Sequence, residues 1–280
     1  MNAILLCAIA VSLSQGLGLP GGLDVTHLSQ SARGELAIFL RDEFCYCGCP
    51  QSVEECLAKH PSCRHARRMT GLAASLAEQG TASGEMSLTL GTYYQSFGAP
   101  RKALLPDARL CKGPPKAVIT IVEFFDFECP ACNHVRPWLN DLVQKNKDVR
   151  LCAVPFPLPG HPHAQPAGRL ALLARDRGKF WDIYESIFEH QRELSVPLLT
   201  QLAAKVGVKA EEVRAALANG RYQDELRKMV ALGRESGVHS TPSLFLNGRP
   251  FLLPLRAEAL QHALDDEREW QRSGKKWAKD

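Results

Sequence analysis

The sequence contains no apolar run of the ~18 residues that a membrane-spanning helix requires, so we expect no stable membrane insertion of the mature protein. It also lacks a strong charge imbalance, because 34 Lys and Arg stand against 30 Asp and Glu, for a net charge of +4. No dense stripe of basic residues with interleaved aromatics occurs, and we therefore expect no nucleic-acid partner. A composition of 45% hydrophobic and 23% charged residues is typical of a soluble globular protein.

The amino-terminal apolar run, Ala3 to Leu13, is too short to span a bilayer but fits the core of a secretory signal. Small residues follow at Ser14, Gly16 and Gly18, as signal cleavage requires. The segment lacks a positively charged side chain before the run, and a buried N-terminal helix is the alternative. We interpret residues 1–18 as a signal peptide and expect a periplasmic or secreted protein.

Cysteine is abundant, with ten in the chain. Such a count is unusual for a reduced cytosolic protein and is common in oxidising compartments. If Cys7 is removed with the signal, the odd total that is left implies a free thiol or an intermolecular partner. Five of the cysteines lie close together in the sequence, at Cys45, Cys47, Cys49, Cys56 and Cys63.

Cys111 stands apart from that group, directly before Gly113-Pro114-Pro115. Because Pro-Pro cannot continue a helix, we interpret this segment as a linker between two domains. The part before it, residues 19–112, has the apolar spacing of helices and predicts a small Cys-rich helical domain. Residues 113–280 then form the second domain.

The second domain alternates strands with helices. Its apolar, β-branched and aromatic runs are typical of buried strands, and Asn-Gly is typical of a hairpin turn. The expected elements are, in order, a strand at 118–125, a helix at 130–145, a strand at 149–156, a helical block at 163–236, a strand pair around Asn247-Gly248 and a helix at 256–270. This order predicts an α/β fold, the thioredoxin fold with a helical insertion, preceded by the small Cys-rich helical domain.

Cys129-Pro130-Ala131-Cys132 follows the first of these strands and begins the next helix. The N–H groups and the dipole at a helix N-terminus stabilise an anion, so Cys129 should have a lowered pKa and attack as the thiolate. Cys132 lies one turn later and can reach back to close a disulfide. We expect Cys129 to be exposed and Cys132 to be partly covered. The pair could also be half of a zinc site or a structural disulfide, although no second CxxC follows it.

Ser240-Thr241-Pro242 places a proline at the start of a later strand, which fits a cis peptide bond between Thr241 and Pro242. Such a loop leaves backbone groups available to pair with an extended substrate chain beside the sulfur. We therefore expect Thr241 and Pro242 to bind substrate.

The run from Phe124 to Cys132, together with Ser240-Thr241-Pro242, resembles the DsbA-like thioredoxin family over about residues 115–272. The resemblance implies that Cys129 is the nucleophile, that Cys132 is the resolving thiol and that the Thr241–Pro242 bond forms the cis-proline loop. It also implies a protein thiol–disulfide oxidoreductase that exchanges disulfides with exported proteins and works with a separate redox partner. No cofactor is expected for such an exchange, and no residue is assigned to a metal.

The same resemblance implies a buried acid at Glu123, beneath the cysteine pair. Burial raises the pKa of a carboxyl, so Glu123 would accept or relay the proton of Cys132. The alternative is an edge carboxylate in water. Strongly oxidising members of the family carry His where this chain has Ala131, which leaves oxidase, isomerase and reductase directions open.

The N-terminal cysteine group admits three interpretations. The five cysteines and Cys111 could form three disulfides that staple a helical domain with a thin core. They could bind zinc or copper, because thiolates suit soft ions, and the protein would then be a metal-binding or metal-delivery protein with a redox-helper thioredoxin domain. They could also be a second redox centre.

The third interpretation comes from a resemblance over residues 35–105. The run Phe44 to Cys49, the later Cys56 and Cys63, and the aromatic residues from Tyr93 to Phe97 are similar to the thiol domain of the cytochrome c maturation protein CcmH. This resemblance implies a thiol relay or a role in the maturation of haem proteins such as cytochrome c.

Two further features are interpreted without a chemical role. His161-Pro162-His163 predicts a loop and a helix entry, since no further metal ligands cluster near it in the sequence. Cys152 lies in an apolar strand and is expected to be a small buried hydrophobe.

Overall fold

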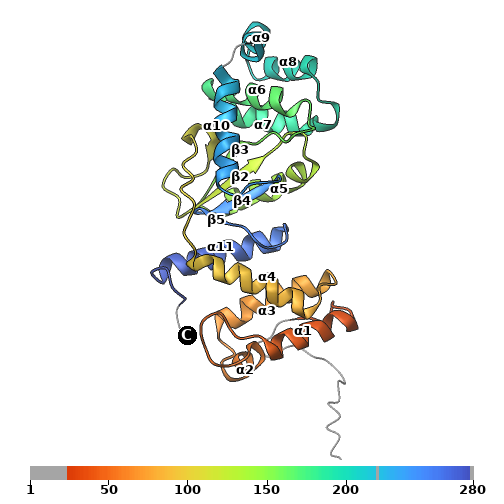
Figure 1. Ribbon diagram of the computed structural model, residues 1–280, viewed down its shortest axis with the longest axis vertical. Coiled ribbons are helices and arrows are strands. Elements are labelled where there is room, and N and C mark those ends of the chain that lie inside the picture. The colour runs from red at the N-terminus through yellow and green to blue at the C-terminus, as the bar shows by residue number, and fades with distance from the viewer. Residues whose placement is uncertain (1–23, 219–220, 278–280) are drawn as a thin grey trace, which may run out of the picture. The chain divides into compact units, whose positions relative to one another are not determined.

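We describe the protein from a computed structural model, in which residues 24–218 and 221–277 are described. The predicted signal peptide, residues 1–18, lies outside these residues. Within these residues the chain divides into two compact units, one made of residues 24–91 and 277 and the other of residues 92–218 and 221–276. Figure 1 labels most of the helices and strands. Within the described ranges, no helix is both long enough and apolar enough to cross a membrane.

The first unit is helical, as the sequence predicts. It contains α1 (Gln30–Asp42), α2 (Val53–Lys59), α3 (Arg64–Glu78) and most of α4 (Ser83–Gln95). The first three helices begin at a side-chain cap, where Ser29, Ser52 and Cys63 accept hydrogen bonds from backbone N–H groups. These caps satisfy donors that a helix start leaves unpaired, which stabilises short helices in a small unit.

A five-stranded mixed sheet lies at the centre of the second unit, in the order β1-β3-β2-β4-β5. β2 and β3 are parallel, and the other neighbouring pairs are antiparallel. The strands are β1 (Cys111–Lys112), β2 (Ile119–Phe125), β3 (Val149–Pro155), β4 (Ser243–Leu246) and β5 (Arg249–Pro250). The central strands are buried on both faces, which explains their nearly continuous apolar sequence.

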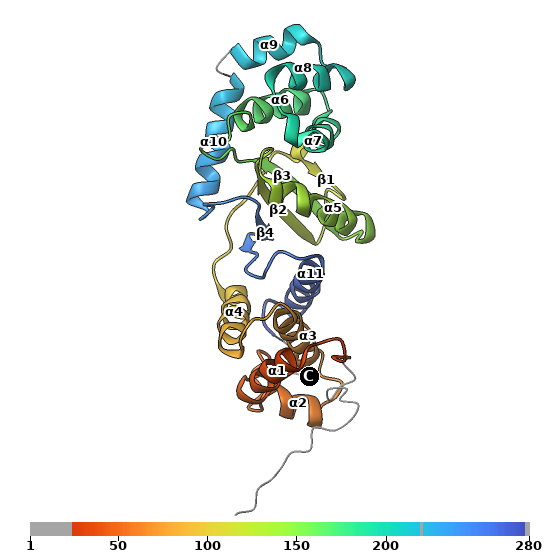
Figure 2. The same ribbon diagram turned by 90° about the vertical axis from the view of Figure 1, so that its right-hand side faces the viewer.

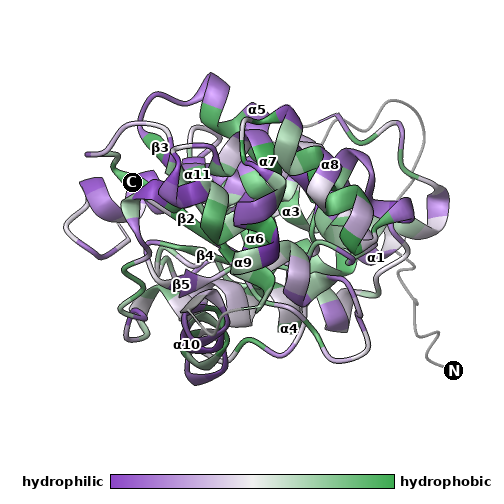
Figure 3. Ribbon diagram, turned by 90° about the horizontal axis from the view of Figure 1, so that it is seen from above, coloured by the Kyte–Doolittle hydropathy of each residue, from purple (hydrophilic) through white to green (hydrophobic). Residues whose placement is uncertain are grey.

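Each face of this sheet packs against its own cluster of buried hydrophobic residues. Phe125 and Ala153 belong to one cluster, while Phe124 and Val154 belong to the other, as expected for neighbouring residues on a strand. Figure 2 shows α5 and α10 on opposite sides of the sheet. Figure 3 shows hydrophilic colour over much of α10, and the α10 residues that pack against the second cluster are Met229, Val230 and Leu232.

The helices of this unit confirm the predicted α/β fold with a helical insertion. The helix predicted at 130–145 is α5, and the predicted helical block contains α6 to α10. The bounds are α5 (Pro130–Lys145), α6 (Ala164–Asp176), α7 (Phe180–Glu189), α8 (Val196–Lys205), α9 (Ala210–Ala218), α10 (Arg221–Glu235) and α11 (Ala257–Arg272). Short 3-10 turns lie at Ser96–Gly98, Ala108–Leu110 and Gln191–Glu193.

The predicted Asn247-Gly248 turn joins β4 to β5. Both residues have positive φ, 49° and 78°, which suits a two-residue hairpin. Gly248 is also required by space, because a Cβ there would lie 2.2 Å from the carbonyl oxygen of Lys102. β4 pairs with β2 as well as with β5, and it follows directly after the Thr241–Pro242 loop.

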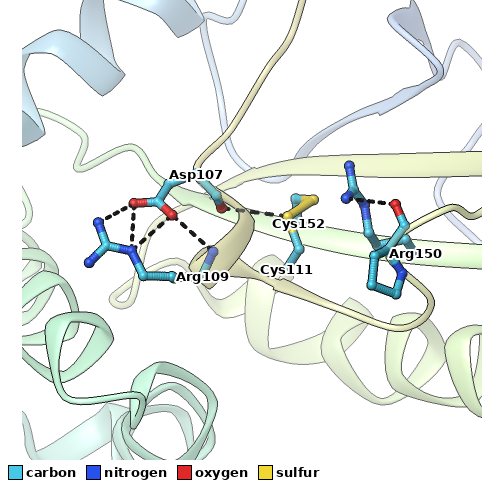
Figure 4. Close-up of a disulfide and its surroundings, with 6 residues drawn as sticks. Asp107, Arg109, Cys111, Arg150 and Cys152 are labelled. Carbon is cyan, nitrogen blue, oxygen red and sulfur yellow. Dashed lines mark hydrogen bonds and ion pairs between the residues drawn. A yellow bond between two sulfur atoms is a disulfide. The ribbon is translucent and has the colours of Figure 1, made fainter.

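The region around Cys111 differs from the sequence prediction. Residues 92–112 were expected in the N-terminal domain but belong to the second unit, because Cys111 and Lys112 form a strand that pairs with β3. The register places Cys111 opposite Cys152, and the two form a disulfide (Figure 4). The expectations that Cys111 pairs within the N-terminal group and that Cys152 is an unpaired hydrophobe are therefore wrong.

Removing this disulfide is expected to lower stability. The two cysteines are 41 residues apart in sequence, and closing such a loop in the unfolded chain corresponds to about 4 kcal/mol in the chain-entropy model. We expect the double variant Cys111→Ala/Cys152→Ala to lose about 2–4 kcal/mol of unfolding free energy in denaturant titrations without reductant. With reductant, wild type and variant should differ much less. Equal stabilities without reductant would contradict a structural role.

Candidate active site

The junction of β2 and α5 carries Cys129 and Cys132. The strand ends at Phe125, and Cys129 is the N-cap of α5 with Pro130 in its first turn. The N–H of Cys129 donates to the carbonyl of Asp126, and the N–H of Cys132 donates to the carbonyl of Cys129, each at 3.1 Å. These turns place both sulfurs at the start of the helix, where the dipole favours a negative charge.

Both cysteines are more covered than the sequence suggests. Cys129 is 7% exposed and Cys132 is fully buried, so the expectation of an exposed Cys129 is wrong. The reason is the loop before β4, whose Thr241 carbonyl oxygen lies 3.1 Å from the Cys129 Sγ. Cys129 nevertheless remains the more accessible of the two sulfurs. Both are thiols, so the structure describes the reduced form of the pair.

The two thiols differ in acidity. A hydrogen bond from the Cys132 thiol, with further interactions from Thr241 and the backbone of Ala131 and Cys132, lowers the pKa of Cys129 to about 5 despite its partial burial. Burial, followed by the hydrogen bond to Cys129 and the charge of Glu123, raises the pKa of Cys132 far above its usual value. One sulfur is thus a thiolate at neutral pH, while the other keeps its proton.

The peptide bond between Thr241 and Pro242 is cis, as the sequence predicts. The loop that contains it comes 112 residues after Cys129 and contacts its sulfur. β4 begins directly after this loop and pairs with β2, which explains how two distant segments meet at one sulfur.

Glu123 lies on β2 and is fully buried, so the alternative of an edge carboxylate in water is wrong. The Tyr184 hydroxyl on α7 donates to its Oε2 at 3.1 Å, and its Oε1 has no hydrogen-bond partner among the residues described. Burial raises the pKa of Glu123 to about 8, against the opposing effects of Tyr184 and Lys112. A carboxyl of this kind can carry a proton near neutral pH.

Two acidic residues just before the cysteines are held by histidines that the sequence analysis left without a chemical role. The Asp126 carboxylate lies 2.8 Å from the His161 Nδ1 and accepts from the Leu158 N–H at 2.6 Å. The Glu128 carboxylate lies 3.1 Å from the His163 Nδ1 and accepts from the His163 N–H. Each acid is therefore paired with one of the two histidines, in the same order along the chain.

The hydrogen bond with Asp126, aided by the charges of Asp126, Glu128 and Cys129, raises the pKa of His161. The matched spacing Asp126-x-Glu128 and His161-x-His163 is the signal from which this pairing could have been predicted. The loop and helix entry expected at the histidines is confirmed, since α6 begins at Ala164.

Gln191, which the sequence analysis did not select, supports the backbone of the cysteine motif. Its Nε2 donates to the carbonyls of Phe127 at 2.7 Å and Cys129 at 2.9 Å. Beside it a hollow of ≈ 510 Å³ opens next to the start of α5. The hollow is lined by Glu128, Pro130, Asn133, His134, Pro137, Gln191 and Arg192. An open, partly polar hollow next to a reactive sulfur can receive part of a substrate chain.

The first unit has its own group of thiols. The sulfur atoms of Cys45, Cys56 and Cys63 all lie within 4.8 Å of one another, and that of Cys47 lies 3.0 Å from Cys45. Burial raises the pKa of Cys56 to about 12 and raises that of Cys45 still further. Because Cys111 bonds to Cys152, three disulfides with Cys111 as the sixth member do not form, and that interpretation is wrong.

A thioredoxin-type sheet with a cysteine pair at the start of α5 and a cis-proline loop beside it defines the fold of thiol–disulfide oxidoreductases. A family model described as thioredoxin matches residues 106–266, which is more than half of the chain. The protein therefore belongs to this thioredoxin family, and the resemblance to its DsbA-like members is confirmed. The match leaves the helical unit of residues 24–91 outside.

Among curated proteins, the chain is similar to the Na(+)/H(+) antiporter NhaA 3 of Salinispora tropica, with 34% identity over 160 residues. The match covers 57% of this chain and 24% of that protein, so the chain spans about a quarter of the length of this relative.

Two solved structures share the fold. BdbD from Bacillus subtilis aligns with a TM-score of 0.52 and 20% identity over 60% of this chain and 98% of that one. The thiol-disulfide exchange protein α-DsbA2 from Wolbachia pipientis aligns with a TM-score of 0.51 and 17% identity over 64% and 94%.

Proposed function

We propose that this protein is an exported thiol–disulfide oxidoreductase that exchanges disulfides with protein substrates through Cys129 and Cys132. The observation that carries the proposal is the contrast between the two sulfurs. Cys129, with its pKa lowered to about 5, lies at a helix start beside the cis-proline loop, while Cys132 is buried behind it as a thiol. A reactive thiolate with a protonated resolving partner is what a two-step exchange requires.

In the oxidising direction, a substrate thiolate attacks the Cys129 sulfur of the Cys129–Cys132 disulfide. A mixed disulfide forms, and Cys132 leaves as a thiolate that takes up a proton. A second substrate thiolate then attacks the substrate's sulfur in the mixed disulfide, and Cys129 leaves as the thiolate. The substrate loses two electrons and two protons; the enzyme pair gains the two electrons and one proton, held on Cys132, and the other proton goes to solvent. The low pKa of Cys129 makes it a good leaving group in this second step.

Glu123 is the proposed proton carrier for Cys132. Its unpaired Oε1 and its pKa of about 8 allow it to give a proton to the Cys132 thiolate and to recover it from solvent. In the reducing direction the same group removes the Cys132 proton when this thiol attacks the mixed disulfide. Without such a group, a thiol as deeply buried as Cys132 would deprotonate only slowly.

Substrate would bind between the cis-proline loop and the hollow at the start of α5. The backbone of Thr241 reaches the Cys129 sulfur, and the loop offers main-chain groups to an extended peptide. Side chains on the hollow, among them His134 and Arg192, would contact substrate residues on either side of the reacting cysteine. Such a site would recognise the main chain of a substrate more than its side chains, which suits exchange with many proteins.

Export to the periplasm or to the outside of the cell is part of the proposal. The Cys111–Cys152 disulfide supports it, because structural disulfides persist in oxidising compartments. The apolar segment at residues 3–13 supports it as the core of a signal peptide. A separate redox partner would then restore the Cys129–Cys132 pair after each turnover.

The direct test is a single-turnover exchange. The oxidised protein is mixed with a reduced, unfolded substrate protein whose native form contains disulfides. The loss of substrate thiols is followed together with the gain of thiols in the enzyme. We expect two thiols to appear at Cys129 and Cys132 for each substrate disulfide formed. If thiols appear elsewhere in the chain, or if none appear, the proposal is wrong.

Alkylation of the reduced protein is expected to distinguish the two sulfurs. Because the pKa of Cys129 is about 5, its labelling rate should reach half its maximum near that pH, whereas Cys132 should stay protected to alkaline pH. Rates are measured by quenched labelling and mass spectrometry of the two cysteines. Equal labelling, or labelling of Cys132 first, would contradict the assigned roles.

Ala131→His is expected to make the disulfide more oxidising. Residue 131 is exposed in the first turn of α5, and an imidazolium beside Cys129 would stabilise its thiolate and hence the reduced form. We expect the equilibrium with glutathione to shift at least ~10-fold, about 30 mV, toward the reduced enzyme. Ala131→Asn is the matched control, because it adds a polar side chain without a titratable group. If both variants titrate like wild type, position 131 does not set the direction.

A further inference from the structure

Four buried sulfur atoms gather in the first unit, which does not contain Cys129 and Cys132. Those of Cys45, Cys56 and Cys63 lie within 4.8 Å of one another, and Cys47 adds a sulfur 3.0 Å from that of Cys45. All four residues are at most 4% exposed. We call these four residues the sulfur cluster. Cys49 lies at its edge, half-buried, with its sulfur 3.3 Å from that of Cys47.

Three separate segments build the sulfur cluster. Cys45 and Cys47 lie on a tight turn, in which Gly48 has a φ of 81° and its N–H donates to the carbonyl of Cys45 at 3.1 Å. Cys56 projects from α2, and Cys63 is the N-cap of α3. The cap residues and the left-handed glycine thus hold the sulfurs together from positions as far apart as 45 and 63. Four sulfur atoms that are brought together by a glycine turn and two helices are better explained by a bound ligand than by ordinary core packing.

Disulfides account poorly for this arrangement. The described part of the first unit has five cysteines, an odd number. Cys111, which could have been a sixth partner, forms a disulfide with Cys152 in the second unit. Cys45, Cys47, Cys56 and Cys63 are thiols in the structure, whereas the Cys111–Cys152 pair is a disulfide. Four thiols packed together in a small helical unit are the donor set of a thiolate metal site, since zinc is held by four such ligands in closed structural sites.

The start of α3 offsets part of the cost of a negative charge on the buried Cys63 sulfur. The backbone N–H of Ala66 donates to the Cys63 sulfur at 3.4 Å, at the positive end of a 15-residue helix. The first turn of α3 contains no acidic residue. Four thiolates around a divalent ion have a net charge of −2, and the positive end of α3 lowers the free-energy cost of burying it.

We propose that Cys45, Cys47, Cys56 and Cys63 bind one Zn²⁺ as four thiolates and that the ion holds the first unit together. Binding forms four Zn–S bonds and releases the four thiol protons to solvent, with no change of oxidation state. The ion takes the place that disulfides hold in other small exported domains, because it links the turn, α2 and α3 at once. The proposal does not depend on the activity of Cys129 and Cys132.

The test uses the full chain in a background with Cys129→Ser/Cys132→Ser and Cys111→Ala/Cys152→Ala, which removes the dithiols of the second unit as competing ligands. The protein is reduced, stripped of metal without oxygen, and titrated with Zn²⁺ against a chromogenic chelator. We expect one equivalent of Zn²⁺ to bind and to protect the four thiols from a thiol reagent until a stronger chelator is added. A parallel titration with Cu⁺ separates the two soft ions.

Single variants identify the ligands. Cys56→Ser and Cys63→Ser are expected to weaken Zn²⁺ binding at least ~100-fold, because changes outside the ligand shell alone cause 10- to 100-fold losses. Cys49→Ser is the matched control and should bind like the parent protein. Thiol protection is measured on the parent protein, so the proposal can fail even where a variant does not fold.

Several outcomes would overturn the zinc site. These are the absence of stoichiometric Zn²⁺ binding, tight binding of Cu⁺ with Zn²⁺ lost to the chelator, and loss of binding in Cys49→Ser. A further one is peptide mapping of the unreduced protein that finds members of the sulfur cluster in disulfides. Exchange by the Cys129–Cys132 pair in the wild-type chain is measured separately, so failure of one proposal leaves the other intact.

Discussion

Cys132→Ser is expected to convert the protein into one that accumulates mixed disulfides with its substrates, whereas Cys129→Ser should abolish exchange. In the first variant Cys129 still attacks, since its place at the start of α5 and its contact with the Thr241 loop are unchanged. No second thiol then resolves the intermediate. In the second variant the only accessible thiolate of the pair is lost, and the rate should fall by at least ~10³-fold.

The measurement is non-reducing electrophoresis after mixing with an oxidised substrate protein, combined with initial exchange rates. Cys152→Ala, paired with Cys111→Ala, is the matched control, because it removes two cysteines of the same unit without touching the motif. This control should keep its exchange rate at a temperature where it stays folded. Mixed disulfides that persist in Cys129→Ser, or in neither variant, would contradict the proposed roles.

Glu123→Gln is expected to slow the resolving step about 100-fold, the lower end of what a positioned acid–base group contributes. Glutamine fills the same space on β2 but carries no titratable proton. Attack by Cys129 should keep its rate, since its thiolate already exists at neutral pH. Stopped-flow measurement of the formation and decay of the mixed disulfide separates the two steps. Equal decay in wild type and variant would exclude Glu123 as the proton carrier.

The same variant should change how stability depends on pH. The pKa of Glu123 is about 8 in the folded protein and ordinarily 4.5, so the folded state holds a proton that the unfolded state releases between these values. Wild type therefore loses stability as pH rises through this window, by about 1.4 kcal/mol for each pH unit at most. Glu123→Gln lacks this contribution, so its unfolding free energy relative to that of wild type should increase as pH rises toward 8.

Tyr184→Phe provides a check in the opposite direction. The Tyr184 hydroxyl donates to Glu123 and lowers its pKa, so its removal should raise that pKa further and extend the pH window upward. The aromatic ring, which packs against Phe125 and Phe188, is retained. Denaturant titrations at a series of pH values measure both variants. A Tyr184→Phe window that moves to lower pH would contradict the assignment.

Sequence patterns predicted the elements whose hydrogen bonds are local. The helix expected at 130–145 has those bounds as α5, and Asn247-Gly248 forms the expected turn with positive φ at both residues. β1 was missed because a two-residue edge strand has no periodicity, and its Gly113-Pro114-Pro115 flank is typical of a linker. The predicted partner of Cys111 was wrong for the same reason.

The sequence by itself determined that a cysteine pair begins a helix directly after a buried strand, since strand pattern, proline and cysteine spacing all lie within about a dozen residues. Only the tertiary structure decided what surrounds the pair. Cys129 meets Thr241 across 112 residues, Glu123 meets Tyr184 across 61, and Asp126 meets His161 across 35. These contacts depend on which strands are neighbours and which helix covers which face. Burial of Glu123 and Cys132 follows from the same packing. Burial in turn raises the pKa of each group above its ordinary value.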